Sequence, residues 1–163
     1  MYFGKDYQSF SGKPLMLNHR ELDFVNEWKY LGITVVSGNL FNCSVQKLLN
    51  TFYRSSNSIL NVVRKPSEDV SMKLLYCCSV PNLTYASDVI VFSSGDMQKL
   101  HVATNDAIRK IFTYERWESV KTLREERGYL SITEIFAQRK RNFEQKLPTI
   151  GNSLISALAR IGV

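Results

Sequence analysis

The sequence predicts an α+β fold that is mostly α, in which a small N-terminal antiparallel β-sheet leads into a helical bundle. The first observation behind this prediction is a change in the spacing of apolar residues, from a period of two to about 3.6, after the turn Ser37-Gly38-Asn39. The second is a series of helix start and stop signals in the rest of the chain. Of the 163 residues, 44% are hydrophobic, which is enough to bury one core.

The sheet is expected within residues 14–36. Residues 14–25 have the pattern of a hairpin, with a polar turn at Asn18-His19-Arg20 between two short apolar runs. Residues 28–36 are rich in aromatic and β-branched side chains and are interrupted by Gly32. The turn at residues 37–39 closes the sheet, because glycine and asparagine tolerate positive φ.

The first helix is expected at residues 43–64, where apolar residues recur at helical spacing until Pro66 ends the pattern. The serines and the asparagine at positions 55–58 weaken this helix without breaking it. Its buried stripe is predicted to consist of Val45, Leu48, Leu49, Phe52, Ile59, Leu60 and Val63.

The second helix is expected to begin at Ser67, whose side chain caps it. Pro81-Asn82 should break or kink the chain after this helix, because proline lacks a backbone N–H. Residues 83–92 are then expected to resume as a buried segment, for which helix fits the context better than strand.

Three further helices are predicted downstream. The loop at residues 93–96 caps a helix at 97–114, and a shorter helix at 119–127 stops at a glycine. Ser131 and Glu134 have the spacing of a capping box for the last helix, which runs to about residue 147 and ends at Pro148.

The charge and the cysteines restrict the class of protein. A formal net charge of +6 and a pI of about 9.3 favour an anionic partner such as nucleic acid. Cys77 and Cys78 are adjacent and Cys43 is remote, so they form neither a disulfide framework nor a metal-binding pair, and buried reduced thiols are expected. No apolar stretch approaches the roughly 20 residues of a membrane helix. The N-terminus has no secretory or transit pattern, so we expect an intracellular protein, nuclear or cytoplasmic.

Three segments, in this order, resemble non-LTR retrotransposon (LINE, jockey-like) reverse transcriptases. Trp28-Lys29-Tyr30-Leu31-Gly32-Ile33 resembles the F-K-Y-L-G-V segment of the primer grip at the edge of the palm. Residues 73–76 and 81–85 are similar to the thumb helices. Residues 105–112, with Arg116-Trp117-Glu118-Ser119-Val120 and Leu123-Arg124-Glu125, look like the post-thumb region. The resemblance covers about residues 1–147.

The resemblance implies a division into a palm-edge β segment at residues 1–38, a thumb and post-thumb region at 39–147, and a tail at 148–163. Met1-Tyr2-Phe3-Gly4 resembles the stretch just after the family's motif D lysine. This implies that the fingers, most of the palm and the metal-binding aspartates lie outside this chain. Mg²⁺ is expected only in the full-length polymerase, and no activity or cofactor is expected of this chain alone.

One segment imitates a catalytic motif. Tyr85-Ala86-Ser87-Asp88 resembles the family's Y-A-D-D motif, but Ser87 replaces the first aspartate and cannot supply the carboxylate that a hard divalent cation requires. The segment also follows Tyr30-Leu31-Gly32, whereas the family's motif precedes that element. We therefore expect Asp88 to be an ordinary helix-surface or capping residue, and we expect no catalytic or metal-binding residue.

The resemblance places Tyr30, Leu31 and Gly32 against the primer terminus, where the glycine lets the backbone approach the sugar-phosphate closely. In the alternative interpretation these residues have a structural role: Leu31 and Ile33 face the core of the sheet, and Tyr30 covers its edge. Both interpretations stay open for Tyr30, and we favour the core for Leu31.

Two clusters of basic residues are candidates for contacts to duplex phosphates. On the first helix, Lys47 and Arg54 are one heptad apart and share a face. A further pair of basic residues lies at the end of this helix, where the helix dipole also explains their presence. The second cluster, near the end of the last helix, is equally explained as a solvated face. The terminal pair is Arg64 and Lys65, and the second cluster is Arg139, Lys140 and Arg141.

The expected function is therefore template-primer binding, to an RNA–DNA hybrid or another duplex, as the catalytically incomplete C-terminal part of an RNA-directed DNA polymerase. The missing palm and fingers are a possible partner. Two alternatives remain: a protein-interaction or oligomerisation module that uses orphaned apolar surface, and a retroelement relic without function.

Overall fold

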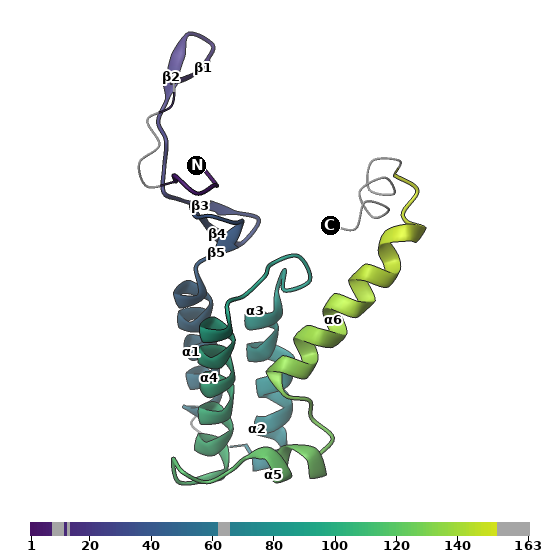
Figure 1. The fold of residues 1–163 in the computed structure, drawn as a ribbon. Coiled ribbons are helices and arrows are strands. Elements are labelled where there is room, and N and C mark those ends of the chain that lie inside the picture. Colours follow the sequence, from purple (N-terminus) through teal and green to yellow (C-terminus); the bar gives the residue numbers. More distant parts are fainter. Residues whose placement is uncertain (8–11, 13, 62–65, 153–163) are drawn as a thin grey trace.

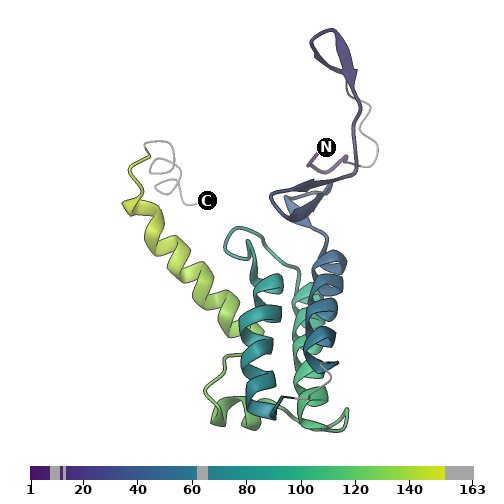
Figure 2. The same cartoon turned by 180° about the vertical axis from the view of Figure 1, so that it is seen from behind.

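A computed structural model describes residues 1–7, 12, 14–61 and 66–152. The chain is α+β and 53% helical, with small antiparallel sheets at the N-terminus followed by helices, as the sequence predicts. Helices pack side by side in a bundle, a three-stranded sheet lies at one end of it, and a two-stranded hairpin stands away from both (Figures 1 and 2).

The outer hairpin consists of β1 (Leu15–Leu17) and β2 (Arg20–Leu22), which pair in antiparallel fashion. The two turn residues, Asn18 and His19, both have positive φ, at 50° and 62°, as the tight hairpin turns that suit twisted strands require. The predicted hairpin and its polar turn are confirmed. All residues of the two strands are exposed, including the side chains of three consecutive apolar residues in β1.

The second sheet has the strand order β3-β4-β5, with β3 (Glu27–Tyr30), β4 (Ile33–Val36) and β5 (Asn42–Cys43), and both pairings are antiparallel. The glycine that interrupts the predicted extended segment lies in a two-residue hairpin turn. Leu31 has φ 45° and Gly32 has φ 86°, so the Tyr-Leu-Gly segment forms the tip of the β3–β4 hairpin.

The first helix, α1 (Val45–Leu60), follows β5 directly and buries most of the predicted stripe. The serines at positions 55 and 58 donate to carbonyls of the preceding turn, and the helix continues through them as predicted. The predicted end of the helix at residue 64 lies outside the described residues. Buried stripe residues are Val45, Leu48, Leu49, Phe52 and Ile59.

The predicted helix caps are confirmed. The Ser67 side chain accepts from the backbone N–H of Val70 at the start of α2 (Glu68–Leu74). Ser93 caps α4 (Ser94–Phe112), which begins slightly earlier than the sequence suggests. Ser131 and Glu134 form the capping box of α6 (Ile132–Lys146). Between α4 and α6 lies α5 (Lys121–Glu126). A 3₁₀ turn, η2 (Leu147–Thr149), follows α6 and contains Pro148.

Of the predicted break or kink at Pro81-Asn82, the break is wrong. After α2 the chain passes through a π-helical turn, η1 (Leu75–Ser79), into α3 (Val80–Thr84) without leaving helical geometry. Pro81 falls in the first turn of α3, where its missing N–H costs little because the widened π turn has already shifted the hydrogen-bond register.

The helix predicted for residues 83–92 is also wrong beyond its first two residues. Tyr85 leaves helical geometry with φ −62° and ψ 128°, and Ala86 has φ 58°. A left-handed alanine cannot continue a right-handed helix. The segment that imitates the catalytic motif is therefore a turn.

One hydrophobic core joins the sheet to the bundle. Ile33 of β4 and Cys43 of β5 belong to the same buried cluster as Phe52 of α1 and Leu100 of α4. β5 lies beyond residue 38 and pairs with β4, so the sheet extends past the first predicted boundary. The division into residues 1–38, 39–147 and 148–163 stays a prediction. Among the described residues no helix is both long and apolar enough to cross a membrane.

Replacing Leu31 by asparagine tests the strain in the β3–β4 turn. Leucine is disfavoured at positive φ by about 1 kcal/mol, whereas asparagine is a preferred residue before glycine in this turn. Because the side chain of Leu31 is 70% exposed, little packing is lost. We expect Leu31→Asn to raise the free energy of unfolding by about 0.5–1 kcal/mol, measured by urea denaturation. Leu40→Asn is the control, since Leu40 is 75% exposed and has no positive φ; an equal gain in both variants would contradict the interpretation.

The helix caps predict loss of stability in acid. The hydroxyl of Ser93 lowers the pKa of Asp96, and that of Ser131 lowers the pKa of Glu134. Each carboxylate therefore stabilises the fold at neutral pH, and the stabilisation is lost as the pH falls below the ordinary values of 3.8 and 4.5 through the lowered ones. Ser131→Ala should lower the urea midpoint at pH 7, and its difference from the wild type should shrink at pH 3. A difference that does not change with pH would argue against the carboxylate's role.

Candidate nucleic-acid interface

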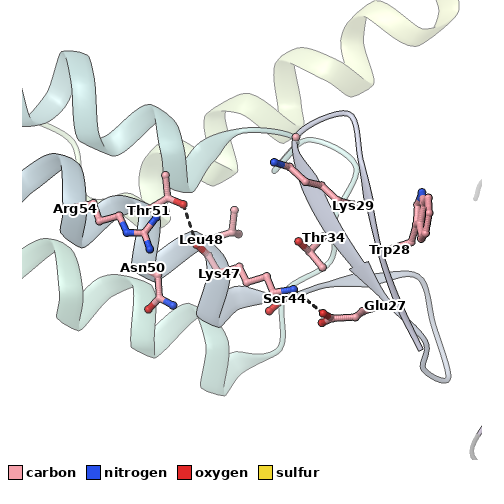
Figure 3. Close-up of a pocket in the computed structure, with 11 residues that line it drawn as sticks. Glu27, Trp28, Lys29, Thr34, Ser44, Lys47, Leu48, Asn50, Thr51 and Arg54 are labelled. Atoms are coloured by element: carbon pink, nitrogen blue, oxygen red, sulfur yellow. Dashed lines mark hydrogen bonds and ion pairs between the residues drawn. The ribbon is translucent and has the colours of Figure 1, made fainter. Parts of the chain in front are cut away.

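A groove of about 440 Å³ lies between the β3–β4 hairpin and α1 (Figure 3). Three of the candidate residues from the sequence, Gly32, Lys47 and Arg54, line it together. The structure thus brings the hairpin tip and the first basic cluster to one place. The complete lining is Glu27, Trp28, Lys29, Gly32, Thr34, Ser44, Lys47, Leu48, Asn50, Thr51 and Arg54.

The exposed face of α1 provides one wall of the groove. Lys47 and Arg54 are seven residues apart, about 10 Å along the helix axis, and both line the groove as their spacing predicts. Between them lie Asn50 and Thr51, and Ser58 follows one turn later, all exposed. No aspartate or glutamate occurs in α1. The face therefore carries cations, an amide and hydroxyl groups, without a carboxylate.

The opposite wall contributes another cation, Lys29, which the sequence reasoning missed. Lys29 lies on β3 directly across from Thr34 of β4, so both side chains are on the sheet face that looks toward α1. Figure 3 shows Lys29 and Thr34 on this side of the hairpin. The alternation of side chains along residues 27–30 puts Lys29 on the face opposite to Trp28 and Tyr30. The sequence did not show how β3 pairs with β4, so it did not show that this face looks toward α1.

The groove has an excess of positive charge. Lys47 Nζ lies 2.8 Å from Glu27 Oε1, and both side chains are about half exposed. Within the described part of the chain, neither Lys29 nor Arg54 has an acidic partner in ion-pair distance. Three cations and one acid line the groove, so its net charge is positive after the ion pair is counted.

The predicted core position of Leu31 is wrong. Its side chain is 70% exposed because the hairpin turn carries it away from the sheet, whereas Ile33 is 7% exposed and belongs to the core as predicted. Tyr30 is 61% exposed. At Gly32, a Cβ atom would lie 3.7 Å from the ring of Tyr85, so the hairpin tip rests beside the turn that follows α3.

The second basic cluster lies on α6 and does not line the groove. Arg139 Nε is 3.2 Å from Asp88 Oδ1, which links α6 to the turn after α3. Lys140 and Glu144 are 4.0 Å apart on the same helix. For Arg139 the contact is therefore structural, while the exposed Arg141 has no ion-pair partner among the described residues. Arg64 and Lys65 lie outside the described residues.

Asp88 and the three cysteines differ in their surroundings. Asp88 pairs with an arginine instead of a second acid, and among the described residues no cluster of three potential metal ligands occurs. Cys43 is buried, and burial, with a smaller contribution from Asp96, raises the pKa of its thiol to about 11. The expectation of burial is wrong for Cys77 and Cys78, which lie on the outer side of η1 and are exposed.

Neutralising Glu27 tests the charge balance of the groove. Glu27→Gln frees Lys47 from its ion pair, so we expect affinity for a polyanion to rise about two- to fivefold, in line with the strength of exposed ion pairs. Glu125→Gln is the matched control, because it removes one acid that faces Lys121 on α5, outside the groove. Binding of a labelled duplex, followed by fluorescence anisotropy, compares the two variants; equal gains would show that only the net charge matters.

Comparisons with protein-family models, with curated proteins and with solved structures found no match to this chain. The α+β architecture with N-terminal sheets agrees with the predicted fold class, but it is not specific to one family. The resemblance to reverse transcriptases therefore depends on the three sequence segments and their order alone.

Proposed function

We propose that this chain holds a nucleic-acid duplex by its sugar-phosphate backbone, in the groove between the β3–β4 hairpin and α1. The observation that carries the proposal is the face of α1 that has Lys47 and Arg54 and no acid, opposite Lys29. A nucleic-acid strand presents a phosphate about every 3.4 Å along the axis. The spacing of about 10 Å between Lys47 and Arg54 then corresponds to about three nucleotide steps.

The polar residues beside the cations fit the same ligand. Side-chain amides and hydroxyls, such as those of Asn50, Thr51 and Ser58, are common hydrogen-bond donors to phosphate oxygens. Contacts of this kind position a duplex without reading its bases. We therefore expect binding that depends strongly on salt and only slightly on sequence.

The resemblance to non-LTR retrotransposon reverse transcriptases supports a more specific role. In this proposal the chain is the palm edge, thumb and post-thumb of an RNA-directed DNA polymerase, and its ligand is an RNA–DNA hybrid or another template-primer duplex. Tyr30, Leu31 and Gly32 then lie at the hairpin tip next to the cationic groove. The metal-binding aspartates and Mg²⁺ belong to the missing palm, so this chain alone is catalytically incomplete.

The exposed apolar surface at the N-terminus favours a second candidate function, a protein-interaction or oligomerisation module. The β1–β2 hairpin exposes leucine and methionine side chains on a two-stranded unit that is marginal in water on its own. The missing palm and fingers are one partner that would cover this surface. Exposed residues of the hairpin are Leu15, Met16, Leu17 and Leu22.

Charge reversal on α1 tests the proposal. Lys47→Glu with Arg54→Glu removes two phosphate contacts, so the affinity for an RNA–DNA hybrid should fall about tenfold or more, and the slope of log K against log salt should become shallower by about two. Both residues are exposed, so the fold should tolerate the change. Anisotropy titrations at several salt concentrations measure both quantities.

The matched control is Lys110→Glu with Lys121→Glu, which makes the same change in net charge on exposed residues of α4 and α5. Lys110 is in the last turn of α4, and this end of α4 lies with α5 at the end of the bundle opposite the β3–β4–β5 sheet (Figure 1). The control should keep the wild-type salt slope. Equal losses in both double variants would show that net charge, and not the groove, governs binding. Self-association without salt-sensitive binding of the hybrid would favour the interaction module instead.

A further inference from the structure

Two large aromatic side chains are exposed on one face of strand β3. Trp28 and Tyr30 are each 61% exposed. They are two residues apart on a regular strand, so both point to the same side of the sheet. Figure 3 shows the Trp28 ring on the side of the hairpin away from α1, opposite to Lys29.

The pairing with β4 explains why this face remains open. Trp28 lies across from Val35 and Tyr30 across from Ile33, and both β4 residues are buried. The side chains that bury these two β4 residues therefore do not extend over β3. Since β3 is the edge strand of its sheet in the order β3-β4-β5, its outer edge and its aromatic side chains are accessible together.

The strand thus separates two surfaces with different chemistry. One face of β3 carries Lys29, and the other carries the two aromatic side chains. Both Lys29 and Trp28 are among the residues that line the cationic groove. A nucleic-acid strand offers both kinds of ligand group, phosphates for the cations and the π faces of bases for the rings. Bases inside a duplex are already stacked on each other, so exposed rings favour unpaired bases.

The spacing of the rings fits bases that are two nucleotide steps apart. Two residues along a strand span about 6.6–6.8 Å, which is about two rises of 3.4 Å in a stacked nucleic-acid strand. A protein partner is the other ligand that exposed aromatic residues attract. The three cations of the groove, Lys29 on this strand and Lys47 and Arg54 on α1, favour a polyanion over a protein at this position.

We propose that Trp28 and Tyr30 form a stacking platform for unpaired bases, so that the preferred ligand is a duplex with a single-stranded overhang. This inference rests on the proposed function, because the groove holds the duplex part of the same molecule. It adds a contact to bases, which the cations of the groove alone do not provide.

Binding to three labelled nucleic acids tests the platform: a blunt duplex, the same duplex with a short overhang, and the single strand. The complete chain should bind the overhang duplex at least about fivefold more tightly than the blunt one, as stacking of one base implies. Trp28→Ala and Tyr30→Ala should each reduce this preference. Trp117→Ala is the matched control, because Trp117 is 82% exposed on the loop between α4 and α5, and it should keep the full preference.

Tryptophan fluorescence gives a second measurement. The chain has two tryptophans, so Trp117→Phe leaves Trp28 as the only one, and addition of the single strand should quench its emission. Equal binding of blunt and overhang duplexes, or equal effects of Trp28→Ala and Trp117→Ala, would overturn the platform and leave the duplex proposal intact. Failure of both duplexes to bind, with Trp28 still quenched by the single strand, would instead overturn the proposed function.

Discussion

The packing of β4 and β5 onto the start of α1 is the constraint on which the rest of the structure depends. Ile33, Cys43, Val45 and Leu48 belong to one buried cluster, and α1 begins immediately after β5. This contact fixes the β3–β4 hairpin above the polar face of α1 and so creates the groove. Because the buried residues alternate with exposed ones along each element, the same sequence pattern that builds the core also sets the cations at the surface.

The hairpin tip and the turn beside it both hold strained backbone. Leu31 and Ala86 both have positive φ, a conformation that costs a non-glycine residue about 1 kcal/mol or more. The two residues flank the contact between Gly32 and Tyr85. Strain of this kind often persists where a surface has a function, and here it lies beside the cationic groove and the exposed aromatic residues.

Local signals in the sequence predicted the parts of the fold that local chemistry controls. Ser67, Ser131 and Glu134 act as caps because their side chains reach the nearest free N–H groups. The break predicted at Pro81 does not occur because a π turn precedes it, and local sequence does not show either this turn or its contact with α1. The groove was predicted in part: the heptad spacing identified Lys47 and Arg54, but Lys29 and the exposure of Leu31 depend on the hairpin register.

The central claim is that one polyanion contacts α1 and the β3–β4 hairpin at the same time. NMR titration of the isotopically labelled chain with a short RNA–DNA hybrid tests it most directly. The account predicts shifts of the amide signals in residues 27–34 and 47–58, with the signals of α5 and α6 unchanged. Shifts centred on Arg139, Lys140 and Arg141, or spread evenly over all basic residues, would contradict it.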